Sequence, residues 1–181
     1  FMPFYPGPGL GGHCIPIDPH YLSWKLRTLN YRTRFIELAD DINSSMPDYV
    51  VSKVGAALNE ASKPIRGSSL LVLGVAYKRD ITDWRESPAV PIIKELQARG
   101  AAVSYQDNYV DSLPLGAHGS GEVLRSVALD YKGMSTYDGV VIVTDHRYFD
   151  VPSILSYAQC VVDTRNLTGQ LGREDPKVVK L

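Results

Sequence analysis

Two uninterrupted apolar runs constrain the fold of this chain more than any other feature of its sequence. Residues 70–73 and 139–144 carry almost no polar side chain, so neither run has a polar face. Strands that are apolar on both faces are typical of a parallel sheet covered by helices on each side. We therefore expect both runs to be inner strands of such a sheet, the first of them over residues 69–77.

Helical patterns alternate with these runs. A helix is expected to start at Ser87 and Pro88 and to stop at Gly100, and a shorter one is expected over 152–157. Further strands are expected over 102–105 and 160–163, and only a short element near 123–127 in the glycine-rich stretch that follows residue 107. Strand, helix and strand in alternation predict an α/β domain with a Rossmann-like, doubly wound parallel sheet.

The segment before this domain is predicted to be helical. Asp18 followed by Pro19 is typical of a helix start, with Asp18 as the N-cap, and the helix is expected to continue into Leu29. A second apolar pattern with helical spacing runs from Thr33 to Ser62 and is interrupted at Pro47. It predicts either one long kinked helix or two stacked helices.

Composition excludes several classes of function. The formal net charge of the 181 residues is −1 and no run of lysine or arginine occurs, so nucleic acid is not an expected partner. No apolar run approaches the roughly 20 residues of a membrane span, so no membrane segment is expected. The two cysteines lie in different contexts, which gives no support to a disulfide or a metal site and favours a cytoplasmic protein. Because Cys160 opens an expected strand, it is interpreted as a packing residue.

A loop rich in glycine and proline carries the strongest chemical signal. It reads PGPGLGGHCIPID from Pro6 to Asp18. Glycine lets the backbone approach a ligand closely, proline stiffens the same segment, and the adjacent His13 and helix start can favour a reactive thiolate at Cys14. A nucleophile and a buried loop cysteine are both compatible with this pattern.

The same loop contains the spacing of the dinucleotide fingerprint, Gly-x-Gly-x-x-Gly, over residues 7–12. That fingerprint requires a strand before it and a helix that opens within it. Here Pro6 precedes the match and Pro8 lies inside it. We therefore interpret the loop as facing a substrate rather than a dinucleotide.

Basic residues follow two of the predicted strands. Lys78 follows the first strand and Arg165 follows the last. Ligands of open parallel sheets bind beyond the carboxyl ends of the strands, so the two cations are expected to share a crevice and to favour an anionic, phosphorylated ligand. A solvated loop with internal ion pairs is the alternative for the segment 77–87. His146 follows another strand and is interpreted as a structural hydrogen-bonding residue.

Three ordered motifs resemble the UDP-glucose/GDP-mannose dehydrogenase family. They are PGPGLGGHCIPIDP over 6–19, GVAYKxxxxDxRxS over 74–87 and VDxR over 162–165. Together they span nearly the whole chain. The Pro-Gly-Pro-Gly form with histidine before the cysteine is similar to the branch that acts on UDP-N-acetylhexosamines, of the glucosamine or mannosamine type.

The resemblance implies a reaction and a set of site residues. In this family, an NAD-dependent four-electron oxidation converts a sugar C6 alcohol into a carboxylate through a cysteine thiohemiacetal and thioester. Cys14 matches the nucleophile, Asp18 matches the carboxylate associated with the catalytic water, and Arg85 matches an arginine that reaches the NAD site. The residues implied to bind the UDP-sugar are Tyr5, Gly9, Gly11, Gly12, Tyr77, Lys78 and Arg165.

The resemblance also implies a domain organisation. Residues 1–64 would hold the cysteine loop and part of a central helical domain that forms a homodimer, and residues 65–181 would form the UDP-sugar-binding domain. The NAD-binding domain of the family is expected to be absent, so the chain is expected to be a carboxy-terminal fragment without dehydrogenase activity that binds NAD poorly. A non-catalytic nucleotide-sugar-binding or assembly module, or a UDP-glucose 6-dehydrogenase, are the alternatives.

Overall fold

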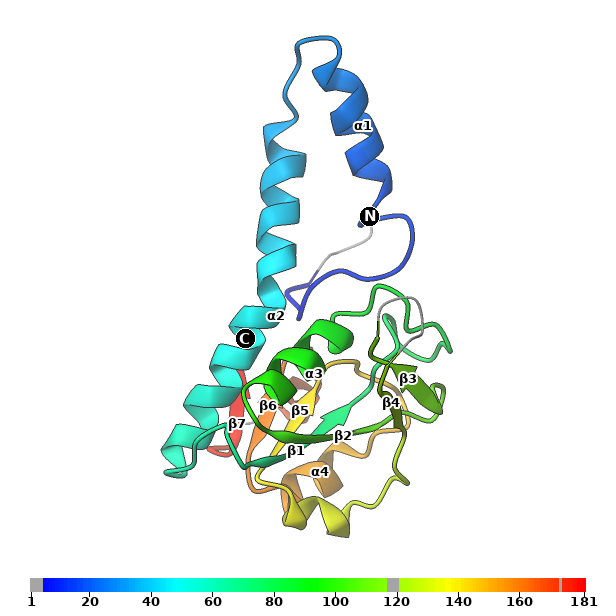
Figure 1. The fold of residues 1–181 in the computed structure, drawn as a ribbon. Helices are drawn as coiled ribbons and strands as arrows, with labels where there is room; N and C mark the ends of the chain where they lie inside the picture. The colour runs from blue at the N-terminus through cyan, green and yellow to red at the C-terminus, as the bar shows by residue number, and fades with distance from the viewer. Residues whose placement is uncertain (1–4, 117–120, 173) are drawn as a thin grey trace.

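The computed structural model describes residues 5–116, 121–172 and 174–181, and consists of a helical hairpin that projects from an α/β domain (Figure 1). The hairpin is formed by α1 (Asp18–Arg27) and by the first half of α2 (Arg34–Glu60). No helix among the described residues is long and apolar enough to cross a membrane.

The α/β domain contains a five-stranded parallel sheet, which confirms the predicted fold class. The strand order is β2-β1-β5-β6-β7, so the chain runs outward from β1 in one direction to β2 and in the other direction to β5. A separate antiparallel pair is formed by β3 and β4. The strands are β1 (Ser69–Leu73), β2 (Ala102–Gln106), β3 (Ser112–Pro114), β4 (Val123–Arg125), β5 (Gly139–Ile142), β6 (Val161–Asp163) and β7 (Val178–Lys180).

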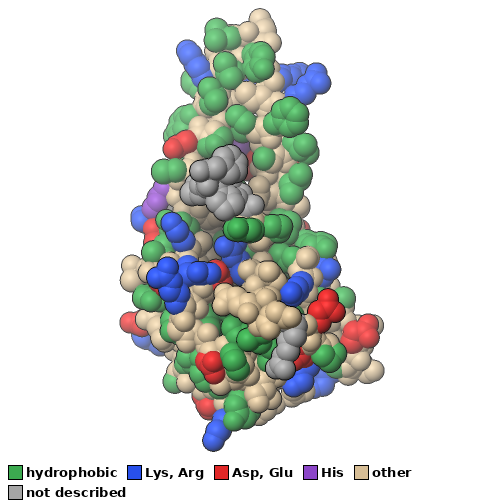
Figure 2. All heavy atoms as spheres, turned by 180° about the vertical axis from the view of Figure 1, so that it is seen from behind, with side chains coloured by type: hydrophobic (Ala, Val, Ile, Leu, Met, Phe, Trp, Pro, Cys, Tyr) green, Lys and Arg blue, Asp and Glu red, His purple; other side chains and the backbone are tan. Residues whose placement is uncertain are grey.

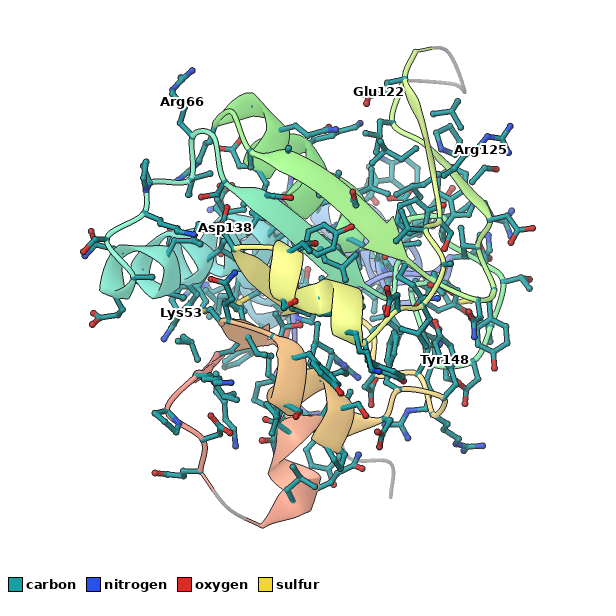
Figure 3. All side chains as sticks on the ribbon, turned by 90° about the horizontal axis from the view of Figure 1, so that it is seen from below. Lys53, Arg66, Glu122, Arg125, Asp138 and Tyr148 are labelled. Carbon is teal, nitrogen blue, oxygen red and sulfur yellow. The ribbon has the colours of Figure 1, made fainter. Side chains whose placement is uncertain are left out.

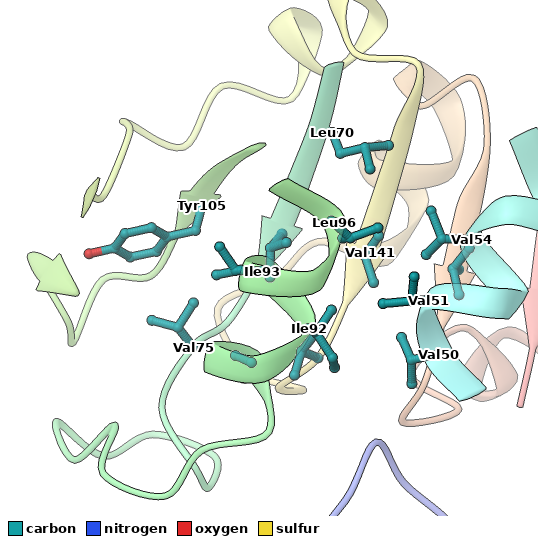
Figure 4. Packing of buried hydrophobic residues seen from close by; sticks show 14 of the residues in the cluster. Val50, Val51, Val54, Leu70, Val75, Ile92, Ile93, Leu96, Tyr105 and Val141 are labelled. Atoms are coloured by element: carbon teal, nitrogen blue, oxygen red, sulfur yellow. The ribbon is translucent and has the colours of Figure 1, made fainter. Parts of the chain in front are cut away.

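Both faces of the sheet are covered by helices. Leu70 and Val72 of β1 point into a core shared with α2 and α3 (Ala89–Ala98), which Figure 4 shows from close by. Leu71 and Leu73 point into a second core with α4 (Val151–Tyr157) and the 3₁₀ helix η2 (Lys132–Thr136). Successive strand residues point to opposite faces, so an apolar run without a polar face is what this two-layer covering requires.

Helix α2 is one continuous helix of 27 residues, and Pro47 lies inside it. Its second half joins the core of the sheet through a buried apolar face. The connection after the helix is fastened by an ion pair between Lys63 and Asp138, and Asp138 also accepts a hydrogen bond from the backbone N–H of Ser69 at 2.8 Å (Figure 3). The buried residues of α2 are Val50, Val51, Val54, Ala57 and Leu58.

The hairpin, by contrast, carries half of the large apolar side chains that are exposed among the described residues. Trp24 is 66% exposed and Phe35 is 88% exposed, and Figure 2 shows hydrophobic side chains spread over the projecting hairpin. A soluble monomer rarely exposes a contiguous apolar surface of this kind, so the hairpin has the character of a contact surface.

Two local predictions are wrong. Asp18 is the first helical residue rather than the N-cap, because the carbonyl of Cys14 accepts hydrogen bonds from the N–H groups of both Ile17 and Asp18 and already turns the chain. Strand β1 ends at Leu73 rather than near Tyr77, because Gly74 adopts a φ of +78°. In addition, β7 and the 3₁₀ helix η3 (Thr168–Leu171) form in a segment for which no element was predicted.

Candidate functional site

The candidate site lies where β1 and β5 end, at the point where the sheet changes direction. Such a point leaves a crevice between two diverging connections, and ligands of doubly wound sheets bind there. Gly74 after β1 is so close to the segment after β5 that a Cβ at this position would lie 2.6 Å from the Cβ of Thr144. The hydroxyl of Thr144 donates to the carbonyl of Ala76 at 2.6 Å, which fastens the two segments together.

The glycine loop passes over this end of the sheet and contacts it through its backbone (Figure 1). A Cβ at Gly11 would lie 2.6 Å from the Cβ of Tyr77, and a Cβ at Gly12 would lie 2.9 Å from Cε2 of the same ring. At Gly7 it would lie 2.5 Å from Nη1 of Arg165. The structure therefore brings the predicted site residues Gly11, Gly12 and Tyr77 together, and Arg165 meets the same loop at Gly7.

The loop is held from the other side by α2 and by the start of α3. Gly9 has a φ of +136°, and a Cβ there would lie 3.2 Å from Pro88 and 3.4 Å from the carbonyl oxygen of Asn43. Pro47 has no N–H to donate to that carbonyl four residues earlier, so the interruption of the helix coincides with the place where the loop docks.

Cys14 and Asp18 lie where the loop enters α1, and both side chains are exposed. Neither side chain makes a hydrogen bond to another residue in the described part of the chain. Of the two interpretations left open for Cys14, the structure excludes the buried loop cysteine, because the residue is exposed. Tyr5, at the start of the described loop, is 78% exposed and is not held against the sheet.

Two arginines at the carboxyl ends of the strands pair with one carboxylate that the sequence analysis missed. Asp145, which follows β5, forms an ion pair with Arg79 and a second one with Nε of Arg165 at 3.4 Å. The backbone N–H of Arg165 donates to the buried carboxylate of Asp163 at 3.0 Å. The sequence Thr-Asp-His directly after a predicted inner strand was the signal from which Asp145 could have been recognised as a site residue. Lys78 is exposed, and no ion pair of this lysine occurs in the described ranges.

Arg85 lies on the exposed loop after β1 and is paired with Asp83. Its Nε and Nη2 atoms each donate to one carboxylate oxygen of Asp83 at 2.9 Å. These hydrogen bonds lower the pKa of Asp83 to about 2 and raise the pKa of Arg85. The carbonyl of Asp83 also accepts from the N–H of Tyr77 at 2.9 Å, so the same residue closes the loop that carries the predicted binding residues.

His146 is fully buried and hydrogen-bonded through both ring nitrogens, which confirms its interpretation as a structural residue. Cys160 is half-buried beside the core of α2 and α3, and burial raises the pKa of its thiol. Its predicted packing role is therefore confirmed. The described residues contain no cluster of three or more side chains that could hold a metal ion.

A cavity of about 710 Å³ lies beside the loop, between α2 and the start of α3. Its walls include Gly9, Phe35, Trp84 and Pro88. Its lining does not include Cys14, Tyr77, Lys78 or Arg165.

Comparisons with known proteins place both parts of the chain in one family. Residues 71–170 match the UDP binding domain of the UDP-glucose/GDP-mannose dehydrogenase family, and residues 1–45 match its central domain. A UDP-N-acetyl-D-mannosamine dehydrogenase of Methanococcus maripaludis strain C7 is 33% identical over 170 residues, which are 90% of this chain and 36% of that protein. A UDP-N-acetyl-D-glucosamine 6-dehydrogenase of Salmonella typhi is 30% identical over 152 residues.

Solved structures agree with this assignment. The structure of a UDP-D-ManNAc dehydrogenase from Pyrococcus horikoshii matches 98% of this chain and 40% of its own chain, with a TM-score of 0.77 and 26% identity. The chain thus spans little more than a third of the length of the relatives that it matches.

Proposed function

Because the chain belongs to the UDP-glucose/GDP-mannose dehydrogenase family, we propose that it carries the UDP-sugar-binding domain and the cysteine loop of an NAD-dependent UDP-N-acetylhexosamine 6-dehydrogenase. The relatives that support this substrate class are named for UDP-N-acetylmannosamine or UDP-N-acetylglucosamine. In this proposal, residues 1–64 belong to the central helical domain and residues 65–181 bind the UDP moiety.

The observation that carries the proposal is the docking of the glycine loop on Tyr77 and Arg165. These residues follow β1 and β6, at the edge of the sheet where a nucleotide would bind, and the loop that covers them continues directly to Cys14. A ligand with an anionic part beside Arg165 and a sugar extending along the loop would therefore approach the exposed thiol.

The residues of this chain would perform three tasks in the reaction. Arg165 and Lys78 would hold the diphosphate, because cations form strong charge-assisted hydrogen bonds with phosphate oxygens. The thiolate of Cys14 would add to the C6 aldehyde, and the resulting adduct would be oxidised to a thioester by loss of hydride. Asp18 would orient the water that hydrolyses the thioester and releases the C6 carboxylate.

In the longer protein, NAD would supply the acceptor for both hydrides of the four-electron oxidation, the one lost when the C6 alcohol becomes the aldehyde and the one lost from the thiohemiacetal. Of the described residues, Arg85 is the one we assign to this cofactor, since its guanidinium is exposed and can face a phosphate on the side away from Asp83. The described strands are not followed by a glycine-rich turn that opens a helix, so these residues do not make up a complete NAD site. We therefore propose that this chain alone lacks dehydrogenase activity.

Two measurements test the proposal. Calorimetry with UDP should show binding to this chain, and Arg165→Ala should abolish it. In the longer protein, Cys14→Ala should abolish formation of the C6 acid without changing UDP affinity. If acid formation persisted, Cys14 would not be the nucleophile, and if the chain formed NADH from NAD and substrate, the proposed lack of activity would be wrong.

A further inference from the structure

His146 connects two stretches of backbone that flank the proposed UDP-binding residues. It follows β5, is fully buried, and accepts a hydrogen bond at Nδ1 from the N–H of Asp80 at 2.9 Å. Its Nε2 lies 3.0 Å from Oδ2 of Asp107. A backbone N–H can only donate, so Nδ1 is the acceptor, and the ring proton therefore lies on Nε2 and is donated to Asp107.

Asp107 carries the connection to the other side of the segment. Its Oδ2 atom also accepts hydrogen bonds from the backbone N–H groups of Val75 at 2.7 Å and Ala76 at 3.0 Å. Burial acts to raise the pKa of Asp107, but the hydrogen bonds from His146, Val75 and Tyr109 hold it below its usual value. One imidazole thus fixes the backbone on both sides of residues 77–79.

The ring of His146 has little freedom to leave this position. Tyr148 stacks on it with ring centroids 5.3 Å apart and an interplanar angle of 15°, and Tyr109 and Phe149 pack at 5.1 and 5.8 Å. Figure 3 labels Tyr148 beside the sheet. The hydroxyl of Tyr148 in turn accepts from the N–H of Asn108 at 2.9 Å, so the stacking partner is itself fixed.

Asp80 shows what this connection holds in place. Its φ is +58°, in the left-handed region that L-residues rarely adopt, and such a conformation persists only where the surroundings impose it. Two hydrogen bonds hold Asp80 in this conformation. Its N–H donates to His146, and its Oδ1 atom accepts from the N–H of Arg147 at 3.1 Å. Arg79 next to it pairs with Asp145, the residue that also pairs with Arg165.

We propose that His146 is a positioning residue that sets the backbone of Tyr77, Lys78 and Arg79 for UDP binding. It contacts no ligand itself and acts through Asp80 on one side and through Asp107 on the other. This inference rests on the proposed function, because it assigns a purpose to the geometry of the UDP-binding segment.

Three substitutions of His146 test its hydrogen bonds to Asp80 and Asp107 separately. His146→Asn places an amide oxygen near the position of Nδ1 and keeps an acceptor for Asp80, whereas His146→Gln places an amide N–H near Nε2 and keeps a donor for Asp107. His146→Phe removes both hydrogen bonds and keeps an aromatic ring for Tyr148. His20→Asn, at an exposed histidine of α1, is the matched control.

Amide hydrogen exchange of this chain, followed by NMR without UDP, is the first measurement. We expect His146→Gln to accelerate exchange of the Asp80 amide by about fivefold or more, and His146→Asn to do so at Val75 and Ala76, the loss expected for one hydrogen bond. His146→Phe should accelerate both. Equal acceleration across the sheet, including Val162 of β6, or no change at Asp80 and Val75, would overturn the proposal.

Calorimetry with UDP is the second measurement. We expect each of the three His146 variants to weaken UDP binding by about fivefold or more, with no change for His20→Asn. If the unaltered chain failed to bind UDP, the proposed function would fail, while the exchange pattern would still decide whether His146 positions the segment. If the exchange pattern were as expected but UDP affinity were unchanged, His146 would position the segment without contributing to UDP binding, and the proposal would be rejected.

Discussion

The backbone of Gly11 and the side chain of Tyr77 are in such close contact that no side chain fits between them. A Cβ at Gly11 would lie 2.6 Å from the Cβ of Tyr77 and 2.7 Å from the carbonyl oxygen of Glu86. Neither of these atoms is the end of a flexible group that could move aside. The glycine loop is therefore placed against the connection between β1 and α3 by direct backbone contact.

This contact predicts the effect of Gly11→Ala. Forcing a methyl group into a packed contact costs about 1–3 kcal/mol, so the loop should be displaced and UDP binding should weaken. Urea denaturation would measure the free energy of unfolding, and calorimetry the UDP affinity. Gly55→Ala is the control, because its Cβ would meet only side-chain atoms of Ile65, the nearest at 3.3 Å. An equal effect of both variants would contradict the prediction.

Arg165→Lys tests whether a planar guanidinium is needed at the strand end. Lysine keeps the charge but lacks the planar fork of N–H donors that binds a phosphate or a carboxylate through two parallel hydrogen bonds. The loss of a hydrogen bond to a charged group, about 1.5–3 kcal/mol, should weaken UDP binding by about 10- to 150-fold. Arg99→Lys, at an exposed arginine paired with Glu95, should leave UDP affinity unchanged. Equal UDP affinity of Arg165→Lys and the unaltered chain would show that UDP binding does not need the guanidinium.

Asp107 should contribute stability that depends on pH. Its pKa is lowered in the folded chain from the ordinary value of 3.8, so its contribution is present above that value and is lost as the pH falls through the folded pKa. The difference in free energy of unfolding between the unaltered chain and Asp107→Asn should be largest at neutral pH and should shrink below about pH 4. Urea denaturation across this range would measure it, and a constant difference would refute the assignment.

The exposed hairpin should control self-association. Phe35 is 88% exposed, so Phe35→Ser should leave the free energy of unfolding nearly unchanged while reducing the association of the chain. Sedimentation equilibrium would measure the association. Tyr157→Ser, at a residue of α4 that is 37% exposed, serves as the control. Association that is insensitive to Phe35 would argue against the proposed homodimer contact through the helices.

The inner strands and the long helix are predictable from the sequence because burial on both faces and a 3.6-residue period leave strong patterns. β7 is not predictable in the same way, since its three residues, Val178–Lys180, become a strand only by pairing with β6. The docking of the loop on Tyr77 is anticipated by resemblance alone. The pairing of Asp145 with Arg79 and Arg165 depends on strand order, which no local pattern contains.

Helix α2 connects the hairpin, the cysteine loop and the core of the sheet. Its 27 residues form a rod about 40 Å long at about 1.5 Å per residue. One half is embedded in the sheet core, its middle contacts Gly9 of the cysteine loop through Asn43 and Pro47, and its other half stands in the hairpin. The apolar surface of the hairpin and the docking point of the cysteine loop therefore lie on one continuous helix, whose other half is anchored in the sheet core.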